Sequence, residues 1–258
     1  MIRKLNRIFQ DYMREKRLKI GKYIWDRKEK TKIVKGNNFI KDNIIKSILF
    51  LRYDGKIGDM VINSLMFREI KKVYPNIKIG VVARGAAIDI IKDNPNIDKI
   101  YEYHKDRKKI KNLALKIKEE KYDLLIDFSE MLRVNQMMLI NLCGARINIG
   151  IEKDSWNLFD ISLNVRDFDK HISEMYIKIL KFLGINNINS SYDVFSSDYL
   201  LKKLDLENKK YCVFNPYAAS KHRSFSTENI EKISKIILEK NYEKLILILK
   251  CSSSSISC

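Results

Sequence analysis

The stretch Ser47–Val73, SILFLRYDGKIGDMVINSLMFREIKKV, predicts the fold of this chain. It begins with an apolar run, passes through a turn that contains two glycines, and continues as an amphipathic pattern of helical period. In a parallel α/β sheet, such a turn lies at the carboxyl ends of the strands, where backbone N–H groups and the positive end of the helix favour ligands. We therefore expect a ligand site at Arg52–Asp59.

The composition is that of a globular protein with a strongly basic amino-terminal segment. The 258 residues include 45% hydrophobic residues, enough for a substantial core in one large domain or two ordinary ones. The formal net charge is +18, and residues 1–46 contain 15 Lys and Arg against 5 Asp and Glu. More than half of the net charge therefore lies in the first sixth of the chain.

Cysteine usage and hydropathy favour a cytoplasmic protein. Cys143, Cys212, Cys251 and Cys258 show neither paired metal-ligand spacing nor a disulfide framework, which favours a reducing compartment. No run approaches the roughly 20 apolar residues of a membrane-spanning helix. The amino terminus has the charge of a signal peptide without its apolar region, so no secretion signal is expected.

The basic amino-terminal extension, residues 1–46, is expected to contain an amphipathic helix within Met1–Lys32, because apolar residues from Ile2 to Met13 recur at helical spacing. Three interpretations stay open. The helix lies on an anionic membrane surface, where each cation contributes about 1 kcal/mol. Alternatively, its apolar stripe packs on the protein's own body. Nucleic-acid binding is the third interpretation, disfavoured because no recognised nucleic-acid motif occurs.

From Ser47 onward, short β-rich runs alternate with helical stretches, which is typical of a parallel sheet with crossover helices. We expect strands at 48–53, 77–83, 99–103, 123–128 and 146–151. We expect helices at 59–74, 86–92, 105–120, 130–143 and 169–183. Together they predict an α/β fold with an amino-terminal Rossmann-like domain over residues 47–184.

The pattern restarts after an Asn- and Ser-rich stretch at 185–197, which begins a connection at 185–207, and the start of a second domain is expected over residues 208–250. The expected elements are a short helix at 198–204, a strand at 211–215, a helix at 227–240 with Ser226 as N-cap, and a strand at 244–249. One strand-helix-strand unit is too small for an independent open sheet. Because residues 251–258 form a Ser-rich irregular tail, we expect the second domain to be cut short.

Two strand-to-helix loops carry the candidate site residues. Asp59 is either a general base or a helix cap. In the loop at 215–225, Ser220, Lys221 and Arg223 supply donors suited to a diphosphate at the start of the next helix, although a solvated basic loop is an alternative. Neither G-x-G-x-x-G nor G-x-x-x-x-G-K-[ST] occurs, which disfavours an NAD enzyme and a P-loop NTPase.

In this order and one domain apart, the two loops resemble those of glycosyltransferase family nine, the lipopolysaccharide heptosyltransferases. The family's first strand leads to an Ile-Gly-Asp-Val-like turn, here Ile57-Gly58-Asp59, and its second domain opens with a Pro-Gly-Ala-Ser-like loop followed by Lys or Arg, here Pro216–Lys221. The further matching stretches are Tyr74–Ile79, Asn94–Ile100, Tyr122–Asp127 and His171-x-x-Glu174. The resemblance covers about Ser47–Leu249.

The resemblance implies a GT-B architecture of two Rossmann-like domains, the first on the acceptor side and the second on the donor side. It implies inverting transfer of heptose from an ADP-heptose-like donor to an anionic lipopolysaccharide core acceptor, with no metal or other cofactor. The residues so implied are the catalytic base Asp59, the diphosphate-binding Ser220, Lys221 and Arg223, and the acceptor-binding Gly58, Arg133 and His171. It also implies a cytoplasmic protein, peripheral on the inner membrane, which the basic helix would bind.

Two departures from the family pattern keep other functions open. The Arg52–Gly58 segment is one residue longer than the commonest family spacing. The family's later Gly-x-x-Thr-Gly-x-x-His-like donor loop is expected beyond the end of this sequence. The alternatives are a catalytically inactive remnant that binds membrane or acceptor, and a basic nucleic-acid-binding α/β protein.

Overall fold

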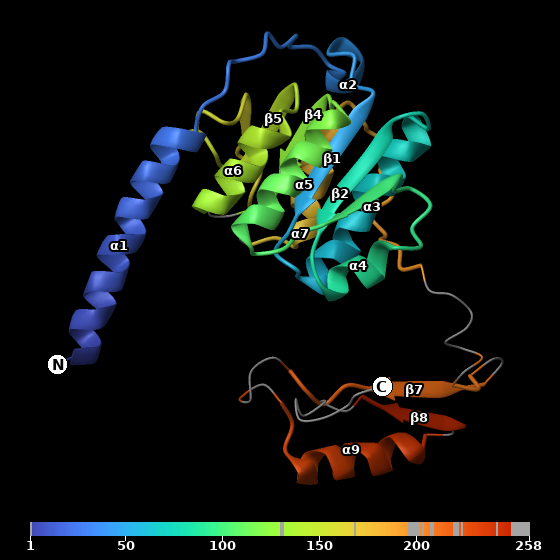
Figure 1. Cartoon of the computed structure of the whole chain (residues 1–258). Helices are drawn as coiled ribbons and strands as arrows, with labels where there is room; N and C mark the ends of the chain where they lie inside the picture. Colours follow the sequence, from blue (N-terminus) through green and yellow to red (C-terminus); the bar gives the residue numbers. More distant parts are fainter. Residues whose placement is uncertain are drawn as a thin grey trace. The chain divides into compact units, whose positions relative to one another are not determined.

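A six-stranded parallel sheet forms the centre of the first of two units, Met1–Phe195 and Ser196–Cys258 (Figure 1). The computed structural model describes residues 2–129, 132–167, 169–195, 202, 204–206, 209–218, 222, 224–240 and 242–248. The strands, in the spatial order β3-β2-β1-β4-β5-β6, are β1 Ser47–Arg52, β2 Lys78–Ala83, β3 Lys99–Glu102, β4 Leu124–Asp127, β5 Ile147–Ile151 and β6 Ile161–Leu163. The order reverses between β1 and β4, the place where such sheets bind ligands.

Helices cover both faces of this sheet (Figure 1). The helices are α3 Ile57–Val73, α4 Ala86–Ile91 and α7 Ile172–Phe182 on one face, and α5 Arg107–Glu119 and α6 Val134–Cys143 on the other. Alternate side chains of β1 enter the two layers, since Ile48 and Phe50 belong to the core with α3, and Leu49 and Leu51 to the core with α5. A strand buried on both faces explains the continuous apolar run in the sequence.

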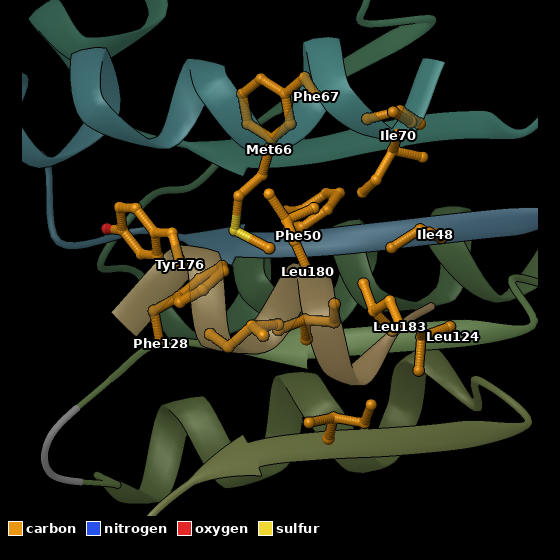
Figure 2. Packing of buried hydrophobic residues seen from close by; sticks show 14 of the residues in the cluster. Ile48, Phe50, Met66, Phe67, Ile70, Leu124, Phe128, Tyr176, Leu180 and Leu183 are labelled. Carbon is orange, nitrogen blue, oxygen red and sulfur yellow. The ribbon is translucent and has the colours of Figure 1, made fainter. Parts of the chain in front are cut away.

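An aromatic cluster fills the centre of the α3 and α7 layer (Figure 2). The ring of Phe50 lies 5.1 Å from that of Phe67 on α3 and 6.1 Å from that of Phe128, which follows β4. Tyr176 of α7 meets Phe128 edge to face at 5.4 Å. Rings at these separations add to the free energy of burial and tie two helices to the sheet.

The five strands and five helices predicted for residues 47–184 are all present, with corrections at two helix starts. Helix α6 begins at Val134 rather than 130, because Arg133 is its N-cap and donates its backbone N–H to Gln136 Oε1 (2.8 Å). Helix α7 begins at Ile172 rather than 169, because the His171 ring accepts from the backbone N–H of Ser173 (3.3 Å). Capping side chains therefore set both boundaries.

Two short elements were not predicted from the sequence. Helix α2, Phe39–Asp42, is a single turn capped by Asn38, whose Oδ1 accepts from the backbone N–H of Lys41 (3.0 Å). Strand β6 has only three residues and pairs with the end of β5. Neither is long enough to display a hydrophobic period.

In the second unit, β7 Tyr211–Phe214 and β8 Lys244–Leu247 form a parallel pair connected through α9 Thr227–Leu238. Ser226 is the N-cap of α9, as predicted, and its Oγ accepts from the backbone N–H of Asn229 (3.3 Å). Most of the helix predicted at 198–204 and the whole tail at 251–258 lie outside the described residues. The strand-helix-strand order is thus the one expected for this region.

Helix α1, Ile2–Trp25, contacts the rest of the first unit at its carboxyl-terminal end. Lys22 Nζ donates to the carbonyl of Ser155 (2.7 Å), and the Asn141 amide donates to the carbonyl of Trp25 (3.1 Å). The helix ends seven residues before the predicted limit. Phe9 is 61% exposed and Tyr12 is exposed as well, so the hypothesis that the apolar stripe packs on the body is wrong for these residues.

The chain that follows α7 is fixed to α3 by Arg68. Its guanidinium donates to the Asp193 carboxylate (2.8 Å) and to the backbone carbonyls of Asn189 and Ser191, both at 2.7 Å. The backbone N–H of Asp193 donates to Ser64 Oγ (2.7 Å). The last described residues of the first unit therefore run along α3.

Buried tyrosines make the fold sensitive to alkali. Burial raises the pKa of Tyr53, Tyr101, Tyr103 and Tyr122, and it raises the pKa of Tyr176 to about 12. Above pH 10.0, where unfolded phenols ionise, the unfolded chain binds fewer protons than the folded one, so the free energy of unfolding falls as pH rises towards about 12. Phenolate absorbance is expected to rise in two stages, the later one accompanied by loss of helical circular dichroism. Complete, reversible titration of all phenols with the helical signal intact would contradict this.

Candidate functional site

The loop after β1 places Asp59 at the carboxyl edge of the sheet. Gly55 takes a positive φ of 75°, a conformation that favours glycine, and turns the chain from β1 into α3. The N-cap of α3 is Lys56, which makes no side-chain cap hydrogen bond, and Asp59 lies in the first helical turn. The alternative prediction that Asp59 is the helix cap is therefore wrong. Its carboxylate lies instead at the positive end of a helix dipole.

Two cations hold the Asp59 carboxylate. Arg52 Nη2 lies 3.0 Å from Asp59 Oδ2, and Lys56 Nζ lies 3.6 Å from the same oxygen. Arg52 is only 4% exposed, whereas the Asp59 side chain is 25% exposed. The extra residue in the Arg52–Gly58 segment does not separate the two groups. The result is a carboxylate at the protein surface with a buried cation behind it.

A second carboxylate near this edge is engaged within the fold. Asp127, at the end of β4, is fully buried and accepts from the hydroxyls of Tyr53 (2.7 Å) and Ser129 (2.5 Å). Lys153 donates to the carbonyl of Ser129 (2.7 Å). Burial raises the pKa of Asp127, opposed by the two hydroxyls and by the Lys153 charge. Since both Asp127 oxygens are occupied, Asp59 is the better candidate base of the two.

Two further basic residues lie near the carboxyl edge of the sheet. Arg133 is exposed just before α6, and Arg84 follows β2. Their positive charges lower the pKa of Tyr103, which follows β3, but burial raises that pKa more strongly. Sequence reasoning identified Arg133 but missed Arg84. The signal was its place at the end of a buried strand: Arg84 directly follows β2, as Arg52 is the last residue of β1.

The remaining predicted residues divide into three groups. Gly58 is exposed, and a Cβ built on it would meet nothing within 4 Å, which leaves room beside its backbone. His171 is the N-cap of α7, with its Nδ1 2.9 Å from Ser173 Oγ; no contact with Asp59 is found among the described residues. The predicted diphosphate-binding residues Ser220, Lys221 and Arg223 lie outside the described residues.

The described ends of the second loop are closed by backbone contacts. Phe225 donates its backbone N–H to the carbonyl of Pro216 (2.9 Å), and Ala218 donates to Ser224 Oγ (3.0 Å). Phe214 of β7 meets Phe225 at 5.9 Å. The loop therefore returns to its own strand at the start of α9, the geometry that favours an anion at a helix N-terminus.

Two cavities lie away from Asp59. Their volumes are about 510 and 300 Å³, and both are lined by Arg27–Glu29, after α1. The smaller one also reaches Gly144–Arg146, before β5, and therefore lies at the amino-terminal edge of the sheet. Within the described ranges, no group of three or more His, Cys, Asp or Glu side chains is arranged to hold a metal ion. In the same ranges, every helix is too short or too polar to cross a bilayer.

No protein-family model matches the chain. The chain is similar to lipopolysaccharide heptosyltransferase 1 of Campylobacter coli, with 23% identity over 203 residues that cover 71% of this chain and 58% of the relative. It spans about three fifths of the length of the curated relatives it matches.

Two solved structures share the fold. A glycosyl transferase family 9 structure from Veillonella parvula gives a TM-score of 0.66 at 18% identity, over 78% of this chain and 62% of that one. The structure of the Escherichia coli heptosyltransferase WaaC with ADP gives a TM-score of 0.59 at 14% identity, over 80% of this chain and 67% of that one. The predicted fold class, α/β of the GT-B type, and the predicted resemblance to family nine are confirmed.

Proposed function

We propose that this relative of glycosyltransferase family nine transfers a sugar, heptose, from an ADP-heptose-like donor to a lipopolysaccharide core or related acceptor, with inversion. The observation that carries the proposal is the Asp59 carboxylate, open to solvent at the carboxyl edge of the sheet and held from behind by Arg52 (3.0 Å). A group in this position can take a proton from an acceptor hydroxyl. Relatives named heptosyltransferases support the choice of sugar.

In the proposed reaction, Asp59 takes the acceptor hydroxyl proton while the hydroxyl oxygen attacks the anomeric carbon. A new carbon–oxygen bond forms on one face of the sugar, and the bond to the diphosphate breaks on the other. The electron pair of that bond leaves with the nucleoside diphosphate, where Ser220, Lys221 and Arg223 would stabilise its charge. No step requires a metal ion.

The basic edge supplies the proposed acceptor contacts. Arg133 precedes α6, Arg84 follows β2, and Lys56 Nζ lies 3.6 Å from Asp59 Oδ2. Guanidinium groups bind carboxylates and phosphates in a fork geometry, which suits an anionic glycan. The open space at Gly58 would let the acceptor approach the start of α3, and His171 would contact the acceptor from α7.

The test is to incubate the purified chain with ADP-heptose and a heptose-deficient lipopolysaccharide core, and to measure ADP release together with the mass of the glycan. We expect one heptose added for each ADP released. Donor and acceptor binding are measured separately by calorimetry. Acceptor binding without donor binding would support the inactive remnant instead, and binding of neither substrate would overturn both.

We further propose that α1 binds the membrane surface that carries such an acceptor. One face of α1 carries four exposed apolar or aromatic residues, because a rotation of about 100° per residue brings together Phe9, Tyr12, Ile20 and Tyr23. The opposite face packs on the body, since a Cβ on Gly21 would meet Val134 at 2.6 Å. This exposed face is therefore directed away from the protein, and it also carries a cation, Lys16, 4.7 Å from the Tyr12 ring.

Vesicle sedimentation tests this surface. The chain is expected to bind vesicles that contain phosphatidylglycerol and not vesicles of phosphatidylcholine alone, with binding weakened by salt. The double variant Phe9→Glu/Tyr12→Glu is expected to lose binding. A matched control, Val73→Glu/Leu115→Glu, changes exposed apolar residues of α3 and α5 by the same charge and should bind like wild type. Equal binding by both double variants would contradict the proposal, and salt-sensitive duplex DNA binding would favour the nucleic-acid alternative.

A further inference from the structure

Arg52 is a buried cation whose carboxylate partners all lie in the loop and helix that follow it. Its Nη2 is 3.0 Å from Asp59 Oδ2 and 3.6 Å from Asp54 Oδ2. Its guanidinium lies 5.4 Å from the centre of the Phe128 ring. A buried charge is costly unless it is paired, so these carboxylates are what make a cation tolerable at the end of β1.

The fold itself leaves Arg52 poorly satisfied. Among the described residues, its buried Nε and Nη2 make no hydrogen bond of acceptable geometry, although the ion pairs are close. The nearby Tyr176 hydroxyl, which is buried and lies in the electrostatic field of Arg52 and Asp59, also has no hydrogen-bond partner there. Buried polar groups without partners are uncommon and destabilising. An apolar side chain against Phe128 would serve packing better, so packing does not explain a guanidinium here.

We propose that Arg52 is a positioning residue for Asp59: by holding Oδ2, it directs Oδ1 towards the acceptor hydroxyl. This inference rests on the proposed function of Asp59 as the base. The hydroxyl proton passes to Oδ1 as the new glycosidic bond forms, and Asp59 becomes neutral. Asp54, 3.6 Å from the same Nη2, then keeps the Arg52 charge paired. Asp59 thus accepts the proton, while Asp54 preserves an ion pair with Arg52.

A double-variant cycle on the full chain tests this role. Arg52→Met is expected to lower kcat for sugar transfer by about 10²-fold, the cost of misplacing a catalytic group by about 1 Å, with the KM for donor unchanged. Arg52→Lys, which restores the charge, should recover part of the loss. In an Asp59→Asn background, Arg52→Met should cause no further loss, because Arg52 acts through Asp59. Additive losses, or a change confined to KM, would overturn the proposal.

The matched control is Arg146→Met. Arg146 also pairs with an aspartate, Asp123 at 3.2 Å, but lies before β5 at the other edge of the sheet, so kcat should not change. Urea unfolding of the four cycle proteins gives a reading that does not depend on activity. If the free energies of unfolding show coupling between Arg52 and Asp59 but the wild-type chain transfers no sugar, only the proposed function is overturned. Absence of coupling between Arg52 and Asp59 would overturn the positioning role. If Arg52→Met does not fold, Arg52→Lys replaces it in the same cycle.

Discussion

Replacing Asp59 by Asn is expected to lower kcat for sugar transfer by about 10²–10⁴-fold, the usual contribution of a general base. The amide is close in size to the carboxylate but cannot take the acceptor proton. Because Asp59 is not a helix cap, and because Asp54, 3.6 Å from Arg52 Nη2, still pairs with the buried cation, the substitution should leave the fold intact. Steady-state kinetics with ADP-heptose and acceptor give kcat and KM, and donor binding by calorimetry should match wild type.

The matched control for Asp59→Asn is Asp89→Asn. Asp89 also lies in the first turn of a helix that follows a strand of this sheet, α4 after β2, but its side chain is 71% exposed and pairs only with Lys92 at 3.9 Å among the described residues. We expect its kcat to equal that of wild type. Unchanged turnover in Asp59→Asn would remove Asp59 from the reaction, whereas equal losses in both variants would point to a general effect of charge.

Replacing Phe50 by Ala is expected to lower the free energy of unfolding of the first unit by about 3–5 kcal/mol. Phe50 is fully buried at the centre of β1 and meets the rings of Phe67 and Phe128 (Figure 2). The truncation removes a ring from the contact between sheet, α3 and α7, and leaves a cavity that close-packed neighbours fill only in part. Urea denaturation followed by tryptophan fluorescence measures this loss.

The fluorescence signal belongs to the first unit. Both tryptophans, Trp25 and Trp156, pack against the core on the α5 and α6 face of the sheet. The control is Phe9→Ala, which removes the same ring from an exposed position on α1 and should change stability by less than about 0.5 kcal/mol. A loss below about 1 kcal/mol in Phe50→Ala would mean that the aromatic cluster is not a closely packed core.

The sequence predicted the elements whose pattern is local. Strands such as β1 begin as continuous apolar runs, here Ile48–Leu51, because helices cover both faces of the sheet. The turn at Gly55–Asp59 carries its own glycines. Strand β6 was not predicted because three residues are too few to show a hydrophobic period. Its pairing with β5, rather than its intrinsic propensity, makes this segment a strand. Helix starts shifted where capping side chains, Gln136 for α6 and His171 for α7, determined the boundary.

The candidate site was predictable only in part, because its partners are distant in sequence. Asp127 joins Tyr53 across 74 positions, and no local signal foretells that pair. The Arg52–Asp59 ion pair depends on the path of the loop at Gly55, with a positive φ of 75° that composition alone does not give. The roles of Ser220, Lys221 and Arg223 stay predictions.

The Arg68 contacts make α3 an anchor for the chain as well as a layer of the core. Its first turn carries Asp59, and two turns further along Arg68 binds Asn189, Ser191 and Asp193, the last stretch of chain before the boundary after Phe195. One helix therefore carries the proposed catalytic base at its first turn and anchors the last described residues of the first unit further along.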